Sequence, residues 1–367
     1  MSSKPRKLFY LFPWHLLVLM SLLLAAGLAN LYSASLNGTG EPSAFFRSQL
    51  LWTAIGLVLF GLMLTFHYRY LLAAAWPLYL LSLLLLVLVI FLGKVSGGQK
   101  NWLVLGPLRM QPSELAKLTA VLMLARSFQA RGFESAFRFR DCRRPLAIVA
   151  APMALILVEK DLGSALFFAL LGATALFLAG LKLRWVALGL ILALTVGAVG
   201  YRYLSPHQRG RIQTFLHPER DPRGQGYHLL RSKIAVGSGQ IWGKGYLKGD
   251  LNKFQFLPER HSDFVFPVLA EEWGLAGSAG VLGALLVFFL LLLQAAGKLQ
   301  DRFGAWLILG VAALLFWQCA INLGGVLGLL PLAGVTLPFF SYGGSALLVS
   351  LTGMGMACNA IMRRYMF

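Results

Sequence analysis

The sequence predicts an all-α polytopic membrane protein, with ten transmembrane helices and one large extracytoplasmic loop, and three observations support this. Hydrophobic residues make up 58% of the 367 residues and charged residues only 13%, a composition outside the range of soluble globular proteins. Apolar runs of about twenty residues, the length that crosses a bilayer, recur along the chain. Lysine and arginine gather in alternate short loops between these runs. The even spacing of the runs favours a single domain over residues 1–367.

The first apolar run is expected to remain as an uncleaved transmembrane helix. It follows Lys4, Arg6 and Lys7, and although 33–35 (Ser-Ala-Ser) mimics a signal-peptide cleavage site, the run is too long for a signal-peptide core. The ten predicted spans lie near residues 14–32, 47–66, 71–92, 113–130, 145–158, 162–180, 185–203, 266–296, 303–326 and 342–362.

The short loops on the side of the N-terminus carry most of the basic residues. If the N-terminus is cytosolic, the inside loops and the C-terminal tail contain Arg69, Arg131, Arg138, Arg140, Arg143, Arg144, Lys182, Arg184, Lys298, Arg302, Arg363 and Arg364. The short outside loops contain far fewer cations, chiefly Lys94, Lys100, Arg109 and Lys160. Because short cytosolic loops are enriched in Lys and Arg, both termini are predicted to be cytoplasmic.

A formal net charge of +19 would suggest a nucleic-acid partner in a soluble protein. In a membrane protein the same charge follows from the cytosolic bias of Lys and Arg and from attraction to anionic headgroups, so no nucleic acid is predicted. The three cysteines, Cys142, Cys319 and Cys358, are scattered over a predicted cytosolic loop and two spans. They support neither a disulfide framework nor a metal site.

The fifth run, 145–158, is short for a membrane crossing. As a helix it reaches about 21 Å, whereas the hydrocarbon core is about 30 Å thick. Treating it as re-entrant would place the C-terminal arginines outside, against the charge bias, so a short crossing is predicted. Glu159, Lys160 and Asp161 would then lie at membrane depth, where charged groups normally face a water-filled cavity or a partner. The alternative is that the three are simply interfacial.

Segment 93–112 is rich in glycine and proline and is expected to form an ordered external turn. The next helix is predicted to begin at Pro112-Ser113, with Ser113 as its N-cap. Glu114 complements the positive end of the helix dipole and lies three residues before Lys117, so the two side chains can pair. An ion pair in an apolar span is either structural or part of a substrate cavity, and the sequence favours neither.

Residues 204–265 form the large loop, which the topology places outside. Its many Lys and Arg residues would suit a polyphosphate headgroup, with surface solvation as the alternative. Within it, the glycines around Lys244 resemble a phosphate-binding loop, but the spacing is short and no Ser or Thr follows the lysine.

The boundary between this loop and the next span is the most acidic stretch of the chain. The whole sequence contains only 14 acidic residues, and four of them lie within 256–273. The charged and polar residues of this stretch are Glu259, Arg260, His261, Asp263, Glu271 and Glu272. Such crowding against apolar neighbours marks it as the candidate for chemistry.

The last connector, within 322–346, contains helix-breaking residues at membrane depth. Pro331, Gly334 and Pro338 interrupt any helix, and irregular backbone is tolerated there only if it is packed in protein or lines a cavity. Gly343 and Gly344 are expected to start the final helix, where small residues permit close packing.

These motifs closely resemble the SEDS family, the shape, elongation, division and sporulation proteins. The resemblance rests on four blocks in the expected order, which span nearly the whole chain: 111–117 (Gln-Pro-Ser-Glu-Leu-Ala-Lys), 161–163 (Asp-Leu-Gly), 257–264 (Leu-Pro-Glu-Arg-His-Ser-Asp-Phe) and 322–345, which ends in Phe-Phe-Ser-Tyr-Gly-Gly-Ser. The amino-acid sequence of 226–245 resembles the elongation members of the SEDS family more than its division members. Two departures exist, since Ser262 stands where Thr is usual and Glu159-Lys160 replaces a common Gln-Pro.

The resemblance implies a ten-helix protein of the bacterial plasma (inner) membrane. It implies a peptidoglycan glycosyltransferase that polymerises lipid II, the undecaprenyl-pyrophosphate-linked disaccharide peptide, at the outer leaflet during cell elongation. A class B penicillin-binding protein would supply transpeptidation as partner, beside other membrane proteins of the elongation complex. The division paralogue would have the same chemistry. The essential acidic residue of the family's large external loop maps onto Asp263.

In this interpretation Asp263 is the general base that activates a sugar hydroxyl. Lys117, Arg109 or loop arginines could neutralise the leaving pyrophosphate, with or without a divalent cation, and the sequence assigns no cofactor. Glu259 and His261 are expected to orient or support the site, and Glu114, Asp161 and Ser341 to line its cavity.

Two rival functions remain open from the sequence. Glu114, Lys117 and Asp161 within the bundle would equally suit a flippase that carries lipid II across the bilayer. A scaffold for other wall enzymes is the third possibility. The concentration of polar residues in one external loop favours chemistry on one side of the membrane.

Overall fold

A helix lies on each of the ten predicted apolar runs. The computed structural model describes residues 10–36, 43–96, 99–105, 108–129, 139–200, 202, 206–220, 224–250 and 260–365. The ten helices are α2 (Trp14–Ala34), α3 (Ala44–Thr65), α4 (Arg69–Leu92), α5 (Pro112–Gln129), α6 (Arg143–Val158), α7 (Leu162–Leu178), α8 (Leu183–Gly200), α12 (Val265–Gly297), α13 (Arg302–Val326) and α14 (Gly344–Met362). Six of them, α2, α3, α4, α12, α13 and α14, are long and apolar enough to cross a membrane, and α7 is a shorter apolar helix. The fold is therefore that of a multi-pass membrane protein.

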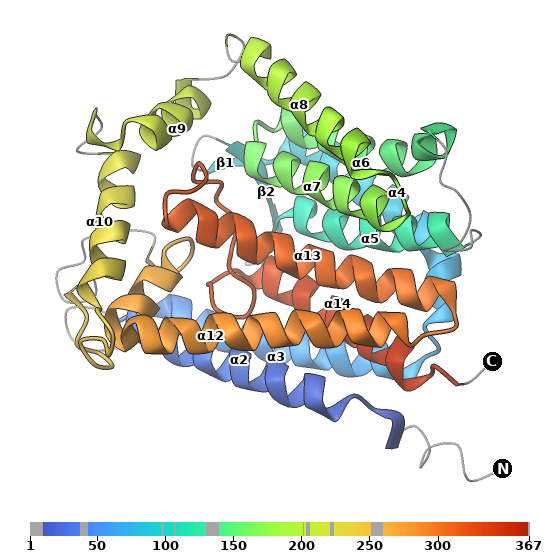
Figure 1. Ribbon diagram of the computed structural model, residues 1–367, viewed down its shortest axis with the longest axis horizontal. Helices are drawn as coiled ribbons and strands as arrows, with labels where there is room; N and C mark the ends of the chain where they lie inside the picture. The colour runs from blue at the N-terminus through green and yellow to red at the C-terminus, as the bar shows by residue number, and fades with distance from the viewer. Residues whose placement is uncertain are drawn as a thin grey trace.

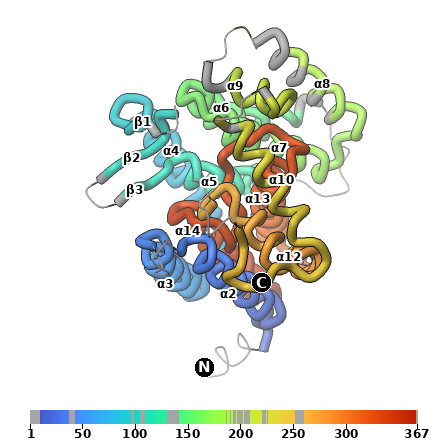
Figure 2. Tube along the Cα trace, turned by 90° about the vertical axis from the view of Figure 1, so that its left-hand side faces the viewer, coloured from blue at the N-terminus to red at the C-terminus, as the bar shows by residue number. Residues whose placement is uncertain are grey.

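The long helices lie side by side, with α13 and α14 inside the bundle. α14 packs along α3, α13 packs against α5 and α12, and α12 packs against α2. The start of α2 and the end of α14 lie at the same end of the bundle, on the right in Figure 1. The opposite end carries the small sheet, α9 (Pro206–Leu216) and α10 (Gln225–Ser238), onto which Figure 2 looks.

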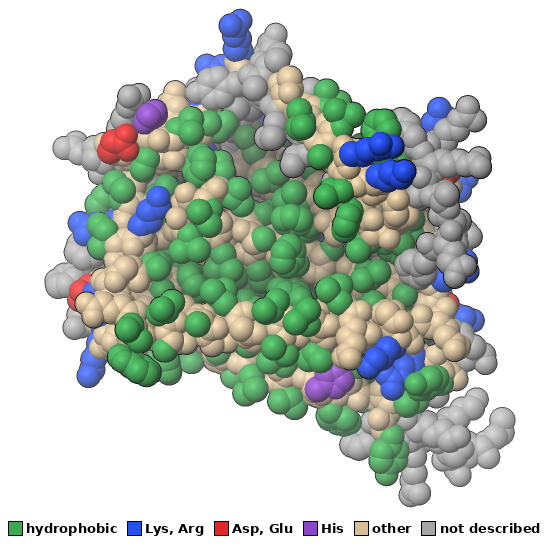
Figure 3. Space-filling model, viewed as in Figure 1, with side chains coloured by type: hydrophobic (Ala, Val, Ile, Leu, Met, Phe, Trp, Pro, Cys, Tyr) green, Lys and Arg blue, Asp and Glu red, His purple; other side chains and the backbone are tan. Residues whose placement is uncertain are grey.

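The outer faces of the helices are apolar. Leu286, Leu290 and Leu293 on α12 are exposed, as are Leu80 and Leu84 on α4. Figure 3 shows hydrophobic side chains across the middle of one face, with most charged side chains toward its left and right margins. This distribution is the one expected when the middle band meets lipid and the two ends meet water.

The α3–α14 contact shows how helices of the bundle pack together in lipid, where the hydrophobic effect does not drive their association. A Cβ on Gly56 would lie 2.5 Å from the side chain of Leu351, and one on Gly355 would lie 2.8 Å from the backbone of Phe60. Small residues thus let the two helices approach closely. At the end of α3, Asn359 Nδ2 donates a 2.6 Å hydrogen bond to the carbonyl of Phe66 and so satisfies a backbone group that the helix leaves unpaired.

Segment 93–112 is a three-stranded antiparallel sheet, which the sequence interpretation missed when it predicted a turn. Its strands, in the order β1-β2-β3, are β1 (Lys94–Ser96), β2 (Gln99–Leu105) and β3 (Leu108–Met110). Asn101 and Leu103 on β2 are buried while Trp102 and Val104 are only partly buried, which is the period of two that a strand requires.

Two predicted helix starts need correction. α5 begins at Pro112, because proline is pre-organised for the first helical position, and this places Ser113 inside the first turn. The Ser113 hydroxyl is buried without a hydrogen-bond partner among the described residues, so the prediction that Ser113 is the N-cap was wrong. α6 begins at Arg143 and has 16 residues, two more than the predicted run.

The large loop is partly helical, with α9, the short helix η3 (Pro218–Arg220) and α10. α10 is anchored to the end of α13, since Ser232 Oγ donates to the carbonyl of Val326 at 2.7 Å. Residues 251–259 lie outside the described part of the chain, and the prediction made for Glu259 falls there.

Helix α12 is broken at Gly274, where φ is 65° and ψ is −164°. The loop 239–250 packs against this break. Leu275 N donates to the carbonyl of Gln240 at 2.8 Å, and Ala276 N donates to that of Ile241 at 3.0 Å. The loop therefore satisfies the backbone groups that the break in the helix would otherwise leave unpaired.

The structure explains why the sequence of loop 239–250 is rich in glycine. Gly243 has φ 79°, and a Cβ on it would lie 2.2 Å from the carbonyl oxygen of Glu272. Only glycine permits this approach. Lys244 Nζ lies 2.6 Å from Glu271 Oε1 and 2.7 Å from Asp250 Oδ2, so an ion-pair network holds the loop on the helix. We call loop 239–250, together with the part of α12 from Val265 to the break at Gly274, the clamp.

Candidate active site

The α13–α14 connector, 327–343, passes through the protein interior. Val335, Leu337 and Phe340 are buried although the backbone from 331 to 337 has no regular secondary structure. A Cβ on Gly163 of α7 would lie 2.1 Å from the carbonyl oxygen of Ala333. The sequence left two alternatives for this irregular backbone, packing within protein or lining a cavity, and the burial of these residues shows that it is packed within protein.

Pro331, Gly334 and Pro338 stand in this irregular stretch, as predicted. Gly343 is the N-cap of α14 and Gly344 its first residue. A Cβ on Gly344 would lie 2.6 Å from the ring of Trp52, so a small residue is needed where α14 begins.

Asp263 lies just before α12, and its main chain is fixed by α13. Asn322 Nδ2 donates to the carbonyl of Asp263 at 3.0 Å and to that of Val335 at 2.8 Å. One amide thus joins the candidate base to the connector. Asp263 is only partly buried. A residue that contacts substrate must be accessible in this way.

An arginine lies near the Asp263 carboxylate. The position that a Cβ would take on Gly334 is 3.9 Å from Asp263 Oδ2 and 4.0 Å from Arg211 Nη2. Gly334 has φ 67°, a conformation that favours glycine, and its missing side chain leaves this space open. Arg211 comes from α9 near the start of the large loop, and Asp263 comes from the end of that loop, just before α12, so two distant parts of the loop each contribute one charged group here.

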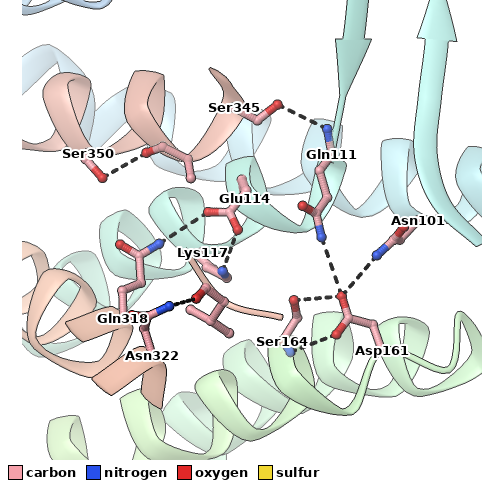
Figure 4. Close-up of polar contacts among 12 residues, drawn as sticks. Asn101, Gln111, Glu114, Lys117, Asp161, Ser164, Gln318, Asn322, Ser345 and Ser350 are labelled. Atoms are coloured by element: carbon pink, nitrogen blue, oxygen red, sulfur yellow. Dashed lines mark hydrogen bonds and ion pairs between the residues drawn. The ribbon is translucent and has the colours of Figure 1, made fainter. Parts of the chain in front are cut away.

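The predicted Glu114–Lys117 ion pair is confirmed. Lys117 Nζ lies 2.7 Å from Glu114 Oε1, and the two side chains are 1% and 8% exposed. Gln318 Nε2 donates to Glu114 Oε2 at 3.3 Å, and Lys117 Nζ is 4.8 Å from the ring centroid of Phe167. Figure 4 shows the pair between α5 and α13. Lys117 is thus directed at protein groups and not at solvent.

Asp161 connects three segments of the chain. It caps the start of α7, where its Oδ1 accepts from Ser164 N at 3.0 Å. Its Oδ2 accepts from Ser164 Oγ at 2.9 Å, Asn101 Nδ2 at 3.4 Å and Gln111 Nε2 at 3.5 Å (Figure 4). The carboxylate is therefore buried but well supplied with donors.

The two residues before Asp161 behave differently. Lys160 has φ 65° and, with Asp161, closes a Schellman motif, in which Lys160 N donates to Leu157 O at 3.1 Å and Asp161 N to Ile156 O at 3.2 Å. Glu159 is 3% exposed, and neither of its carboxylate oxygens has a hydrogen-bond partner among the described residues. A proline at position 160 could not take this φ, so the departure from Gln-Pro has a backbone consequence.

Helix α13 links these groups. Gln318 and Asn322 are one turn apart on it, and they contact Glu114 and the Asp263 backbone respectively. The sequence interpretation did not select Gln318, although an amide in an apolar span is itself a signal. It also did not select Arg211 among the loop arginines, because only the folded chain brings α9 to Gly334.

The remaining candidates have structural contacts. His261 stacks on Phe45 with centroids 4.0 Å apart and lies edge-on to Tyr342 at 5.8 Å. Ser341 Oγ accepts from Leu337 N at 2.8 Å, which closes a turn in the connector. Arg109 is exposed on β3 and makes no hydrogen bond or ion pair within the described part of the chain.

Arg260 is turned toward the main chain, with Nη2 donating to the Leu36 carbonyl at 2.9 Å. Burial lowers the pKa of its guanidinium from the usual value, yet arginine stays charged. In the residues that the structure describes, no three His, Cys, Asp or Glu side chains gather in a way that could hold a metal ion.

Comparison with known proteins now adds to this geometry. Residues 10–366 match the cell cycle protein family of FtsW, RodA and SpoVE. The chain belongs to this family, the SEDS proteins. Among its SEDS relatives, the peptidoglycan glycosyltransferase MrdB of Escherichia coli K12 is 37% identical over 366 residues, covering 97% of this chain and 95% of the relative. The probable peptidoglycan glycosyltransferase FtsW of Aeromonas salmonicida is 34% identical, covering 94% of this chain and 89% of the relative.

Solved SEDS structures agree with the fold. One, from work on the structural coordination of polymerization and crosslinking by a peptidoglycan synthase complex, matches with a TM-score of 0.83 at 34% identity, covering 97% of this chain and 99% of that one. The rod shape determining protein RodA of Thermus thermophilus matches with a TM-score of 0.73 at 32% identity, covering 96% and 98%.

Proposed function

We propose that this chain is a peptidoglycan glycosyltransferase that polymerises lipid II at the outer leaflet during cell elongation, with Asp263 as its general base. The names of the relatives support the reaction class. The observation that carries the assignment of the base is the partly exposed Asp263 carboxylate, which shares the space over Gly334 with Arg211.

The chemistry needs a base and a cation at one place. Asp263 takes the proton from the attacking sugar hydroxyl. At the same time, the hydroxyl oxygen of the acceptor sugar bonds to the anomeric carbon of the donor. The bond from that carbon to undecaprenyl pyrophosphate breaks, and the leaving group takes the electron pair. A positioned base contributes about 10²–10⁴-fold to the rate. The Arg211 guanidinium is suited to the pyrophosphate because its planar fork binds phosphate oxygens.

One displacement inverts the anomeric carbon. Of the carboxylates near the connector, Asp161 is occupied by four donor groups and Glu114 by Lys117 and Gln318. We therefore assign these two to holding the site in shape, and assign the reaction to Asp263 alone.

The proposed topology has ten crossings, both termini in the cytoplasm and residues 204–265 outside. The small sheet, α9 and α10 gather at one end of the bundle, and α2 begins and α14 ends at the other (Figures 1 and 2). A start of α2 and an end of α14 at the same end of the bundle are what an even number of crossings requires. Asp263 then lies at the outer end, where a lipid-linked sugar would be presented.

The partner we propose is a class B penicillin-binding protein that crosslinks the new strands. The related chain in the peptidoglycan synthase complex supports it, because polymerization and crosslinking are coordinated there. The elongation role is supported by the 37% identity to MrdB against 34% for the FtsW relative.

Replacing Asp263 by Asn tests the assignment. In detergent, with purified lipid II and with or without the partner, D263N should polymerise at least about 10²-fold more slowly than the native protein. Glu219→Gln is a matched control, because Glu219 is an exposed acid of the same loop, and it should keep near-native activity. Gel analysis of the glycan chains gives the measurement.

The assay also separates the rival function. Polymerisation in detergent needs no sealed bilayer, whereas a flippase has no measurable activity without one. Native-like glycan chains from D263N, in a protein that still purifies as a folded monodisperse species, would remove Asp263 from the mechanism.

A further inference from the structure

A polar cavity lies at the end of the bundle opposite the candidate active site. Its volume is about 380 Å³, and it forms where α4 begins, α5 ends and α12 connects to α13. In Figure 1 this is the right-hand end, where α14 also ends. The lining residues are Arg69, Gln129, Gln300, Asp301, Arg302 and Phe303. The reaction proposed above does not use them.

The cavity has an excess of cationic groups. Arg69 and Arg302 stand at the first positions of α4 and α13, so the positive ends of two helix dipoles add to their charges. Within the described part of the chain, Arg302 makes no ion pair. Arg69 Nη2 lies 3.4 Å from Asp301 Oδ1, and its side chain remains 52% exposed.

The one acidic group of the lining is already occupied. Asp301 Oδ2 accepts from the hydroxyl of Tyr68 at 2.8 Å and from Gly304 N at 2.9 Å. Its Oδ1 faces Arg69. Asp301 therefore fixes the start of α13 and holds Arg69 in place, and it offers little repulsion to a second anion.

The surroundings confirm the positive character of this end. The pKa of His67, in the α3–α4 connector, is lowered by burial and then by the charges of Arg363 and Arg69. Gln129 and Gln300 add neutral amide donors, and Phe303 supplies an apolar wall. An anion with several acceptor oxygens fits this set.

We propose that this cavity binds the headgroup phosphate of an anionic phospholipid from the same leaflet. Tyr70, 70% exposed, follows Arg69 directly, and Trp76, 48% exposed, lies farther along α4, so the apolar face of that helix begins beside the arginine. Aromatic side chains favour the headgroup level, and basic pockets between membrane helices bind anionic headgroups. A lipid can therefore place its phosphate on the arginines and its acyl chains along α4.

The full-length purified protein tests this by native mass spectrometry and thermal unfolding with phosphatidylglycerol added to the detergent. Phosphatidylcholine, inorganic phosphate and glycerol phosphate are run in parallel. Arg302→Gln and Arg69→Gln should each weaken phosphatidylglycerol binding about five-fold. Gln300→Glu should weaken it as well, because this exposed position would then carry a negative charge in place of an amide donor. Lys298→Gln is the matched control, because Lys298 is an exposed cation at the same end outside the cavity.

The expected result is phosphatidylglycerol binding that only the cavity variants lose. Equal losses in Lys298→Gln and Arg302→Gln would reduce the effect to general surface charge and overturn the proposal. Equal binding of phosphatidylcholine, or equal stabilisation by inorganic phosphate, would overturn it too. None of these outcomes depends on Asp263, so the result stands apart from the proposed reaction.

Discussion

Two carboxyl groups two residues apart show that the free-energy cost of burying such a group depends on its hydrogen-bond partners as well as on its burial. Glu159 and Asp161 are each 3% exposed. Asp161 receives four hydrogen bonds and caps α7, whereas Glu159 receives none from the described residues. A buried polar group without a partner costs free energy that a bonded one recovers.

Substitutions at these two positions should therefore act in opposite directions. Glu159→Gln is expected to raise the free energy of unfolding by about 1 kcal/mol, because it removes the cost of burying an ionisable carboxyl, which is paid either as a charge or as the uptake of a proton. Asp161→Ala should lower it by about 1–2 kcal/mol through loss of the helix cap and its other bonds. Thermal unfolding in one detergent compares the two, and a Glu159→Gln protein less stable than the native one would contradict the first expectation.

Local features of the sequence could select the stretch 256–273 and the buried ion pair, because acidic residues crowd in the first and Glu114 and Lys117 are three residues apart in an apolar span. Within 256–273, only the resemblance to the SEDS family singled out Asp263 as the candidate base. Arg211 could not be selected, because its role depends on the packing of α9 near Gly334. No sequence pattern around position 211 predicts that contact. Ser113 was misjudged because proline at the first helical position took precedence over a preferred capping residue.

At the scale of elements, the break in α12 depends on the clamp. Burial alone would lower the pKa of Lys244, but its bonds to Asp250 and Glu271 outweigh burial and raise the pKa above the usual value. A raised lysine pKa means that the contribution to stability is fully present at neutral pH. It is lost only as the pH rises above about 10.5.

Glu271→Gln should loosen the clamp. The Glu271 side chain is 2% exposed and that of Lys244 is 29% exposed, so the pair is partly screened by solvent. The expected loss is about 1–2 kcal/mol, below the value for a fully buried pair. Limited proteolysis should then cut within 239–250 faster than in native protein. Lys248→Gln, a change of the neighbouring lysine, serves as control, and equal cleavage in both variants would argue against the ion pair.

The elements themselves were largely predictable, since hydrophobic runs of this length have few alternatives to helices. Their interruptions were not. The break at Gly274 lies within one predicted span, 266–296. The strands β1 and β3 have only three residues each, and 102–105 in β2 (Trp-Leu-Val-Leu) shows no alternation of polar and apolar residues. Both features depend on contacts with distant segments.

At the scale of the whole molecule, the two ends of the bundle carry different groups. One end combines Asp263, Arg211 and the clamp, and the other holds the cationic cavity, which the proposed topology places at the cytosolic membrane surface. Lipid-linked substrate would meet the first, and the anionic leaflet the second. The positive charge of the chain is then an orienting and anchoring property, which is consistent with the bias of short loops.

Single-cysteine labelling tests this orientation and the number of crossings. The three native cysteines are buried, so an impermeant maleimide should report introduced sites. Trp242→Cys and Lys160→Cys should be labelled in intact spheroplasts. Gln300→Cys and Lys182→Cys should be labelled only after permeabilisation, because the proposed topology places them on the cytosolic side. All four native side chains are exposed, so accessibility within the fold does not limit the reaction.

The Lys160 and Lys182 sites carry the sharpest part of this prediction, because only α7 separates them. α7 has 17 residues and spans about 25 Å, slightly less than a typical hydrocarbon core. The bias of Lys and Arg toward cytosolic loops still predicts that it crosses. If both sites reacted from the same side, α7 would be re-entrant, nine crossings would remain, and the two termini would lie on opposite sides of the membrane.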